Sequence, residues 1–127
     1  MIFYILVVKL TGKNLIGDNI MRKIINFNTN WKFSKEWNDN IKNEFLKGEN
    51  ITLPHTVHEI PLHYFDEADT WLISGYQNIF NYDKAKLKDK RILINFEGAM
   101  AAAELFINGK SFGEHKGGYL PFIHDIT

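Results

Sequence analysis

Two alternating segments, the second ending at Asn108-Gly109, constrain the fold of this chain more than any other feature. In residues 91–97 and again in residues 101–107, apolar side chains occupy every second position. Successive side chains of a strand point to opposite faces, so each segment predicts a strand with one buried face. Asparagine and glycine both tolerate positive φ, so the pair favours a type I′ hairpin turn. Residues 111–115 are then predicted to form the return strand.

Shorter strand signals lie upstream. Residues 24–33 mix strand-forming residues with asparagine, and residues 76–82 are rich in aromatic and β-branched residues. Residues 51–53 end at Pro54, which cannot donate a ladder hydrogen bond, so a strand end or edge is expected there. Short strands and tight turns indicate an all-β chain folded as an antiparallel β-sandwich. The strands present are few for two sheets, so we interpret the sandwich as incomplete at its C-terminus.

Two segments depart from the strand pattern. In residues 34–46, Trp37, Ile41 and Phe45 are four residues apart, which predicts one face of a short helix or helical loop that ends near Gly48. Residues 54–75 show no sustained period and contain histidines, acidic residues and a tryptophan. We expect a long surface loop there, and such loops commonly carry binding residues.

Composition narrows the class of partner. The 127 residues are enough for one domain, and fifteen basic residues balance fifteen acidic ones. A neutral chain gives no electrostatic reason to expect nucleic acid or a membrane surface as partner. The chain has no cysteine, which excludes disulfides and thiolate chemistry and is compatible with a reducing cytoplasm.

The first twenty residues form a separate problem. Residues 2–8 are an apolar run that is too short to span a bilayer and lacks the flanking features of a signal peptide. Met21 opens a segment that reads as a natural start. We therefore interpret residues 1–20 as a leader outside the domain and residues 21–127 as the domain, in a bacterial cytoplasm. The alternative is an edge strand, because the run favours strand structure.

Several polar clusters could carry chemistry. Asp66-Glu67 could be the paired carboxylates of a glycosidase, but neighbouring residues on an extended loop point apart, and a solvated loop or a domain contact is favoured. A metal site at His55, His58 and His63 is disfavoured, because zinc ligands are more tightly spaced, and His55 is expected to anchor the loop by hydrogen bonds. No metal and no cofactor are predicted.

Glycines and aromatic residues offer two further interpretations. The glycines at positions 113, 117 and 118 lack the spacing of a phosphate loop and fit close backbone approach at a strand corner. Trp71, Tyr76 and Tyr119 could stack on a sugar, since aromatic faces suit apolar sugar faces. Core packing is an equal alternative for the two tyrosines, whereas Trp71 is the better candidate for a ligand-facing or interface surface.

A set of motifs in a fixed order resembles a known family from Met21 onward. The order is Asn30-Trp31-Lys32-Phe33, Leu53-Pro54-His55, Tyr64-Phe65-Asp66-Glu67, Gly75-Tyr76 to Phe80, Phe96-Glu97-Gly98, Ile107-Asn108-Gly109, Gly113 to Tyr119, and Pro121-Phe122 to Thr127. This order and spacing resemble the N-terminal sugar-binding domain of family 2 glycoside hydrolases, the β-galactosidase and β-glucuronidase group. Ala99 and Asn78 depart from the residues that the family usually has at those positions.

The resemblance implies a jelly-roll sandwich at the front of a larger hydrolase, followed by an immunoglobulin-like domain and a (β/α)8 barrel. Both catalytic glutamates of the family lie on the barrel, so no residue here is given a catalytic role. The expected carbohydrate partner is β-galactoside-like, and His55, Asp66, Glu67 and Trp71 are the substrate-binding candidates. Two alternatives stay open: a stand-alone carbohydrate-binding module, and a gene fragment without independent function.

Overall fold

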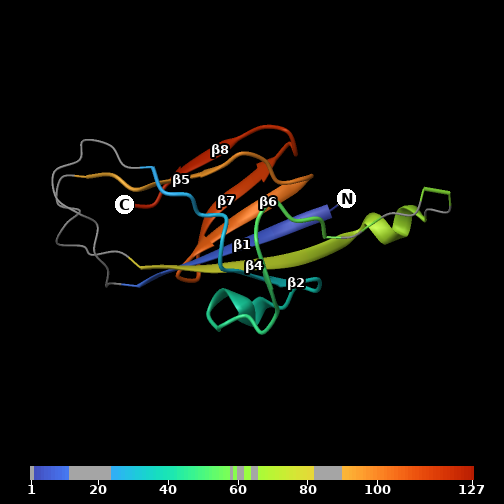
Figure 1. The fold of residues 1–127 in the computed structure, drawn as a ribbon, viewed down its shortest axis with the longest axis horizontal. Helices are drawn as coiled ribbons and strands as arrows, with labels where there is room; N and C mark the ends of the chain where they lie inside the picture. Colours follow the sequence, from blue (N-terminus) through green and yellow to red (C-terminus); the bar gives the residue numbers. More distant parts are fainter. Residues whose placement is uncertain (1, 12–23, 58, 60–61, 64–65, 82–89) are drawn as a thin grey trace.

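The described part of the chain forms two β-sheets. The computed structural model describes the chain except for residues 1, 12–23, 58, 60–61, 64–65 and 82–89 (Figure 1). The strands are β1 (Ile2–Thr11), β2 (Trp31–Ser34), β3 (Glu49–Ile51), β4 (Leu72–Asn81), β5 (Leu93–Phe96), β6 (Ala102–Ile107), β7 (Lys110–Lys116) and β8 (Phe122–Asp125). Two short 3-10 helices, η1 (Asp39–Lys42) and η2 (Glu67–Thr70), complete the described elements.

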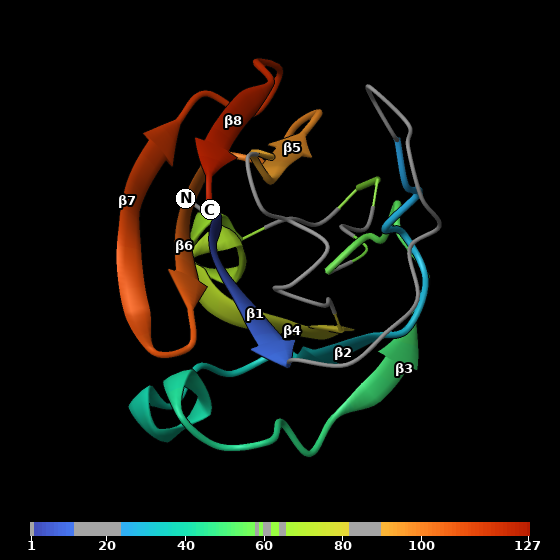
Figure 2. The ribbon, with the colours of Figure 1, turned by 90° about the vertical axis from the view of Figure 1, so that its left-hand side faces the viewer.

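The six-stranded sheet has the order β3-β2-β4-β1-β6-β7, and β5 pairs with β8 in a second sheet. Figure 2 shows the larger sheet curving from β7 to β3, with β5 and β8 lying across from it. This arrangement confirms the predicted all-β sandwich. Among the described residues, no helix is long and apolar enough to cross a membrane.

The core lies between the two sheets. Trp31 and Leu105 are almost completely buried, and Ile94 and Phe122 of the small sheet pack into the same cluster. The inward positions of β2, β4 and β6 supply most of the remaining core side chains, as the alternation of strand residues requires. A second, smaller cluster lies on the outer face of the large sheet, where Ile41 and Leu46 cover Phe106, with Trp37 beside them.

The β6–β7 hairpin confirms the prediction made from its turn. Asn108 and Gly109 have φ values of 49° and 82°, the positive values that a type I′ turn requires. The pairing of Ile107 with Lys110 closes the two-residue turn. Leu105 and Ile107 face the core and Phe106 faces the outer cluster, so β6 is buried on both faces.

Strand β1 is the least expected element. It lies between β4 and β6 and runs parallel to both, with Ile2 opposite Leu72 and Phe3 opposite Ala102. The other strand pairs of the described residues are antiparallel. The strand alternative for this segment is therefore what the structure shows, although the strand is internal and not at an edge. That the native protein begins at Met21 stays a prediction for N-terminal sequencing.

The structure also corrects several predicted boundaries. The predicted strand at residues 24–33 is confined to Trp31–Ser34, and the helix predicted over 34–46 is the single 3-10 turn η1, with Asn38 as its cap. Strand β4 begins at Leu72 and not at Tyr76. Strand β8 was not predicted, because its four residues carry a weak alternation.

Candidate functional site

The predicted binding loop ends in a short arm, residues 66–71, that projects from one end of the sandwich. Figure 1 shows this arm as the yellow-green helical turn beyond the start of β4. Its turn, η2, is capped by Asp66, whose carboxylate accepts a hydrogen bond from the Ala68 amide at 3.0 Å. The amide of Trp71 donates to the Ala68 carbonyl at 3.2 Å and closes the turn. Asp66 therefore holds the shape of the arm.

Trp71 presents an aromatic surface on this arm. Its side chain is 68% exposed, although an indole buries favourably where it can. Glu67, Ala68 and Trp71 line a shallow hollow of about 380 Å³. An exposed ring beside a carboxylate can stack on the apolar face of a sugar and accept hydrogen bonds from its hydroxyl groups.

His55 has a different environment. Its Nδ1 atom lies 2.8 Å from the hydroxyl of Tyr76, and its ring packs on Phe33 at 4.6 Å between centroids. Tyr76 is only 3% exposed and belongs to the core. Phe33 and Tyr76 belong to the sandwich, so His55 fixes the start of the long loop to the core. It does not line the hollow beside Trp71.

The four predicted residues thus fall into two places. Asp66, Glu67 and Trp71 lie together on the arm, whereas His55 lies on the sandwich. A retaining glycosidase needs two carboxyl groups about 5–5.5 Å apart, one as acid and one as nucleophile. The Asp66 carboxylate is engaged in capping η2, which suits a structural role. Within the described residues no three acidic or histidine side chains are grouped to hold a metal ion, and His58 lies outside them.

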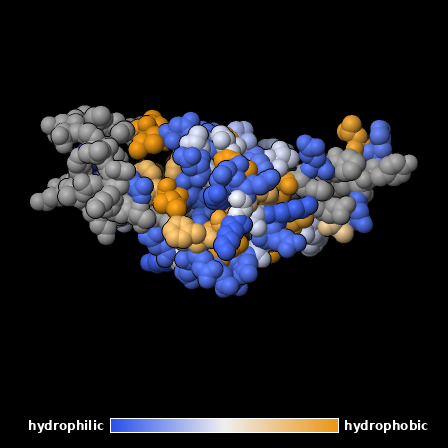
Figure 3. Space-filling view, turned by 60° about the horizontal axis from the view of Figure 1, so that its bottom comes forward, coloured by the Kyte–Doolittle hydropathy of each residue, from blue (hydrophilic) through white to orange (hydrophobic). Residues whose placement is uncertain are grey.

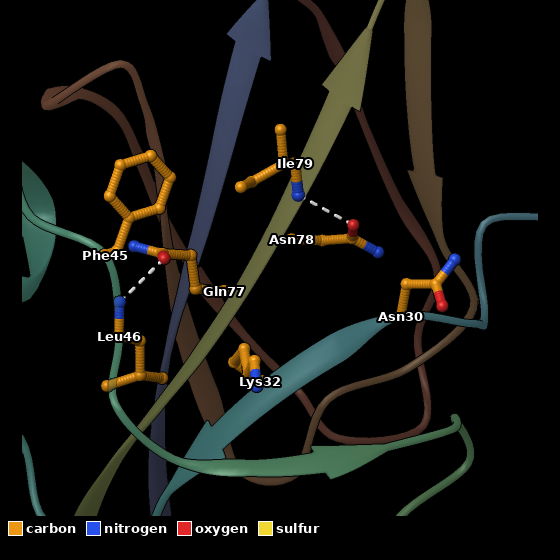
Figure 4. A pocket seen from close by; sticks show the side chains of 7 residues that line it. All are labelled: Asn30, Lys32, Phe45, Leu46, Gln77, Asn78 and Ile79. Carbon is orange, nitrogen blue, oxygen red and sulfur yellow. Dashed lines mark hydrogen bonds between the residues drawn. The ribbon is translucent and has the colours of Figure 1, made fainter.

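A second hollow was not predicted from the sequence. It lies on the outer face of the large sheet, has a volume of about 240 Å³, and is lined by Asn30, Lys32, Phe45, Leu46, Gln77, Asn78 and Ile79 (Figure 4). Gln77 is 2% exposed and accepts a hydrogen bond from the Leu46 amide at 2.9 Å. The sequence offers one signal for this hollow, the glutamine inside the strand predicted at residues 76–82. An amide in a strand needs hydrogen-bond partners from a neighbouring segment when it is buried.

Comparison with known proteins tests the resemblance to the family 2 glycoside hydrolases. The family described as glycosyl hydrolases family 2, sugar binding domain, matches residues 34–127. A β-galactosidase of Thermoanaerobacter pseudethanolicus is 41% identical over 109 residues, which cover 84% of this chain and 14% of that protein.

Two further relatives agree. A β-galactosidase of Thermoanaerobacterium thermosulfurigenes is 43% identical over 104 residues, covering 80% of this chain and 14% of the relative. A β-glucuronidase of Bacteroides fragilis is 33% identical over 117 residues, covering 88% of this chain and 15% of the relative. The chain therefore spans about a seventh of the length of these relatives. The family match at residues 34–127 begins at the last residue of β2 and covers all of β3 to β8, and on this evidence the chain belongs to the sugar-binding domain family of the family 2 glycosyl hydrolases.

Proposed function

We propose that this chain is the non-catalytic sugar-binding domain of a β-galactosidase-like glycoside hydrolase, and that it binds a β-galactoside through the arm around Trp71. The observation that carries the proposal is the 68% exposure of the Trp71 ring over the hollow that it shares with Glu67. The family match and the β-galactosidase relatives support the sugar class.

The contacts of the arm indicate a separate role for each of its residues. The indole of Trp71 supplies the stacking surface, and the Glu67 carboxylate accepts hydrogen bonds from sugar hydroxyls. Asp66 caps η2 and so fixes the direction of both side chains. His55 does not line the hollow, and its contact with Tyr76 anchors the start of the loop to the core. Bond cleavage is assigned to other domains of the longer enzyme, which would supply the acid and the nucleophile.

The test is a calorimetric titration of the full chain with methyl β-galactoside. We expect weak, saturable binding, because one exposed ring and one shallow hollow bury little of the sugar. Trp71→Ala should abolish it, whereas Tyr119→Ala, at another ring that is 87% exposed, should leave it unchanged.

The two variants should melt at the same temperature as the unaltered chain, since both side chains are exposed. Equal binding by the Trp71→Ala variant would contradict the proposal. A second measurement addresses catalysis: the purified chain should release no chromophore from nitrophenyl β-galactoside, and measurable turnover would overturn the non-catalytic assignment.

A further inference from the structure

A slot one strand wide lies between β4 and β6, and β1 fills it. Strand β1 pairs along Ile2–Thr11 with β4 and along residues 3–8 with β6. It runs parallel to both neighbours, whereas the other strand pairs of the described residues are antiparallel. Figure 1 shows β1 in blue between the orange β6 and the yellow-green β4. Since neighbouring strands lie about 4.8 Å apart, β4 and β6 border a slot about 10 Å wide.

The two walls of this slot are positioned by contacts other than those with β1. On its far side β4 pairs with β2, and β6 pairs with β7. Tyr76 of β4 and Leu105 of β6 are buried in one core cluster, which also contains Ile94 and Phe122 of the small sheet. Both walls therefore pack against the same second sheet, which fixes the place that a strand between them occupies.

Apolar side chains flank the slot on both faces of the large sheet. On the inner face, Tyr76 and Leu105 lie in register on its two sides. On the outer face, a Cβ atom added to Gly75 of β4 would lie 3.2 Å from the ring of Trp37, which stacks on Phe106 of β6 at 6.4 Å between centroids. The segment after β2 therefore covers the slot from outside. Figure 3 brings this side of the molecule forward and shows hydrophilic side chains over much of its middle.

These flanks define the kind of strand that the slot fits. Successive side chains of a strand point to opposite faces, so an occupant meets apolar surroundings at neighbouring positions as well as at alternate ones. Strands that are buried on both faces have continuous apolar sequences. The longest apolar run of the chain is the one that includes residues 2–8, IFYILVV. The chain therefore contains a segment of the composition that this slot selects.

The pairing of β1 does not depend on a tight turn. Parallel neighbours cannot be joined by a two-residue hairpin, and the next strand in sequence, β2, lies on the far side of β4. Residues 12–30 separate β1 from β2, and a stretch of that length reaches up to about 60 Å. The main-chain pairing in the slot is therefore the same whether the strand comes from its own chain or from another copy.

From these contacts we propose that the slot between β4 and β6 is a strand-acceptor site and that its partner is a second copy of this chain, which inserts its own residues 2–11. Main-chain hydrogen bonds to β4 and β6 supply the affinity, and the apolar flanks select an apolar strand. Two chains exchange β1 reciprocally, so each slot is filled and the dimer has twofold symmetry. Trp71 takes no part in the exchange, so the site is independent of the sugar-binding arm.

The first test supplies the strand as a peptide. In the full chain, Val7→Pro prevents the chain's own segment from pairing on both sides. A synthetic peptide of residues 2–13 should raise the melting temperature of this variant saturably and recover most of the loss. If the variant does not fold by itself, the peptide should restore the circular dichroism signal of its strands. A peptide with the same proline should do neither, and absence of rescue by the unaltered peptide would overturn the inference.

The second test detects exchange between copies. The chain has no cysteine, and Lys9 lies opposite Ile79, at the strand spacing that a disulfide bridges. A Lys9→Cys chain refolded at high concentration with an Ile79→Cys chain should form a mixed disulfide. Its yield should be about fivefold or more above that with Ile73→Cys, since Ile73 is also exposed but lies opposite Phe3, far along the strand. Equal yields would contradict the exchange.

A locked chain serves as the control for the dimer itself. Lys9→Cys and Ile79→Cys in one chain, oxidised within the molecule, hold β1 in its own slot. In analytical ultracentrifugation the unaltered chain should form a dimer whose share rises with concentration, whereas the locked chain should stay monomeric. A dimer of the locked chain would place the interface elsewhere and contradict the inference. An unaltered chain that stays monomeric up to millimolar concentration would overturn it as well.

Discussion

At the scale of the residue, Gly48 shows how closely two backbones approach at the start of β3, the edge strand that pairs with β2. A Cβ atom at this position would lie 2.1 Å from the carbonyl oxygen of Phe33 and 2.8 Å from its carbonyl carbon. Both are backbone atoms of β2, so the neighbour cannot give way by rotating a side chain. The sequence marks Gly48 as the end of a helix, whereas the structure shows that its lack of a side chain permits the contact between segments.

Gly48→Ala should therefore destabilise the chain by about 2–3 kcal/mol, the usual cost of forcing atoms into a packed contact. Lys47→Ala is the matched control, because that neighbouring side chain is exposed and its loss should cost less than about 0.5 kcal/mol. Urea denaturation of both variants measures the difference. Equal stability of the two variants would show that β2 and the segment at Gly48 do not approach as described.

The burial of His124, at the edge between the sheets, makes stability depend on pH. The rings of His115 and His124 lie beside Phe122, at 4.4 and 5.7 Å between centroids. Among the described residues the Nε2 atoms of both are buried without a hydrogen-bond partner. Burial, followed by the charge of His115, lowers the pKa of His124 from its usual 6.5. The folded chain therefore holds this imidazole neutral where the unfolded chain would protonate it.

Because the pKa of His124 is lower in the folded state, the unfolded state binds more protons below about pH 6.5 and stability falls as the pH decreases. The melting temperature should decline from pH 7.5 to pH 5.5, and His124→Phe should flatten this slope. His63→Asn, at an exposed histidine, should leave the slope unchanged. An equal slope in the His124→Phe variant would refute the assignment of this pH dependence to His124.

Asp125 contributes in a different pH range, since hydrogen bonds from Thr127 and then Arg91 lower its pKa to about 2.

At the scale of the element, β1 joins two parts of the large sheet. Strands β4 and β6 are both paired with β1 and have no pairing with each other. Without β1, the sheet would separate into β3-β2-β4 and β6-β7, each with an unpaired edge. The interpretation of residues 1–20 as a leader makes the opposite prediction, because a leader contributes nothing to the fold.

Val7→Pro distinguishes these two views. Val7 lies opposite Gln77 on one side and Phe106 on the other, so proline there disturbs an internal strand. We expect a loss of about 3 kcal/mol or more in the free energy of unfolding. Ile24→Pro, at an exposed residue outside the strands, should cost far less. A Val7→Pro variant with unchanged stability would show that β1 is dispensable, as a leader would be.

The elements differ in how far the sequence predicts them. The β6–β7 hairpin is local, and its turn residues and alternation suffice to place it. The pairing of β1 with β4 and β6 joins segments some 70 and 100 residues apart. No pattern in residues 2–11 predicts which strands they pair with. Phe45 was predicted to share one helix face with Trp37 and Ile41. The helix is a single 3-10 turn, so the four-residue spacing does not continue, and Leu46 takes the buried position beside Ile41.

At the scale of the whole molecule, the chain is a scaffold that carries two surface hollows on different parts of the sandwich. The resemblance in its motifs predicted the family and the fold, because the motifs include residues within β2 and β4 as well as the turn between β6 and β7. Trp71 was predicted to lie on a ligand-facing or interface surface, and the structure shows its ring exposed. The hollow at Phe45 was not predicted, since it arises where Gln77 holds a distant segment against the sheet.

The most direct test of the central claim, that Trp71 binds sugar on a non-catalytic sandwich, follows the three indole N–H signals of the full chain during titration with methyl β-galactoside. Two of them are internal controls: the Trp31 indole donates to the Phe27 carbonyl at 2.6 Å, and the Trp37 indole donates to Asp39 at 3.1 Å. The account predicts a saturable shift of the Trp71 signal while the other two stay in place. A Trp71 signal that does not move at saturating galactoside would contradict it.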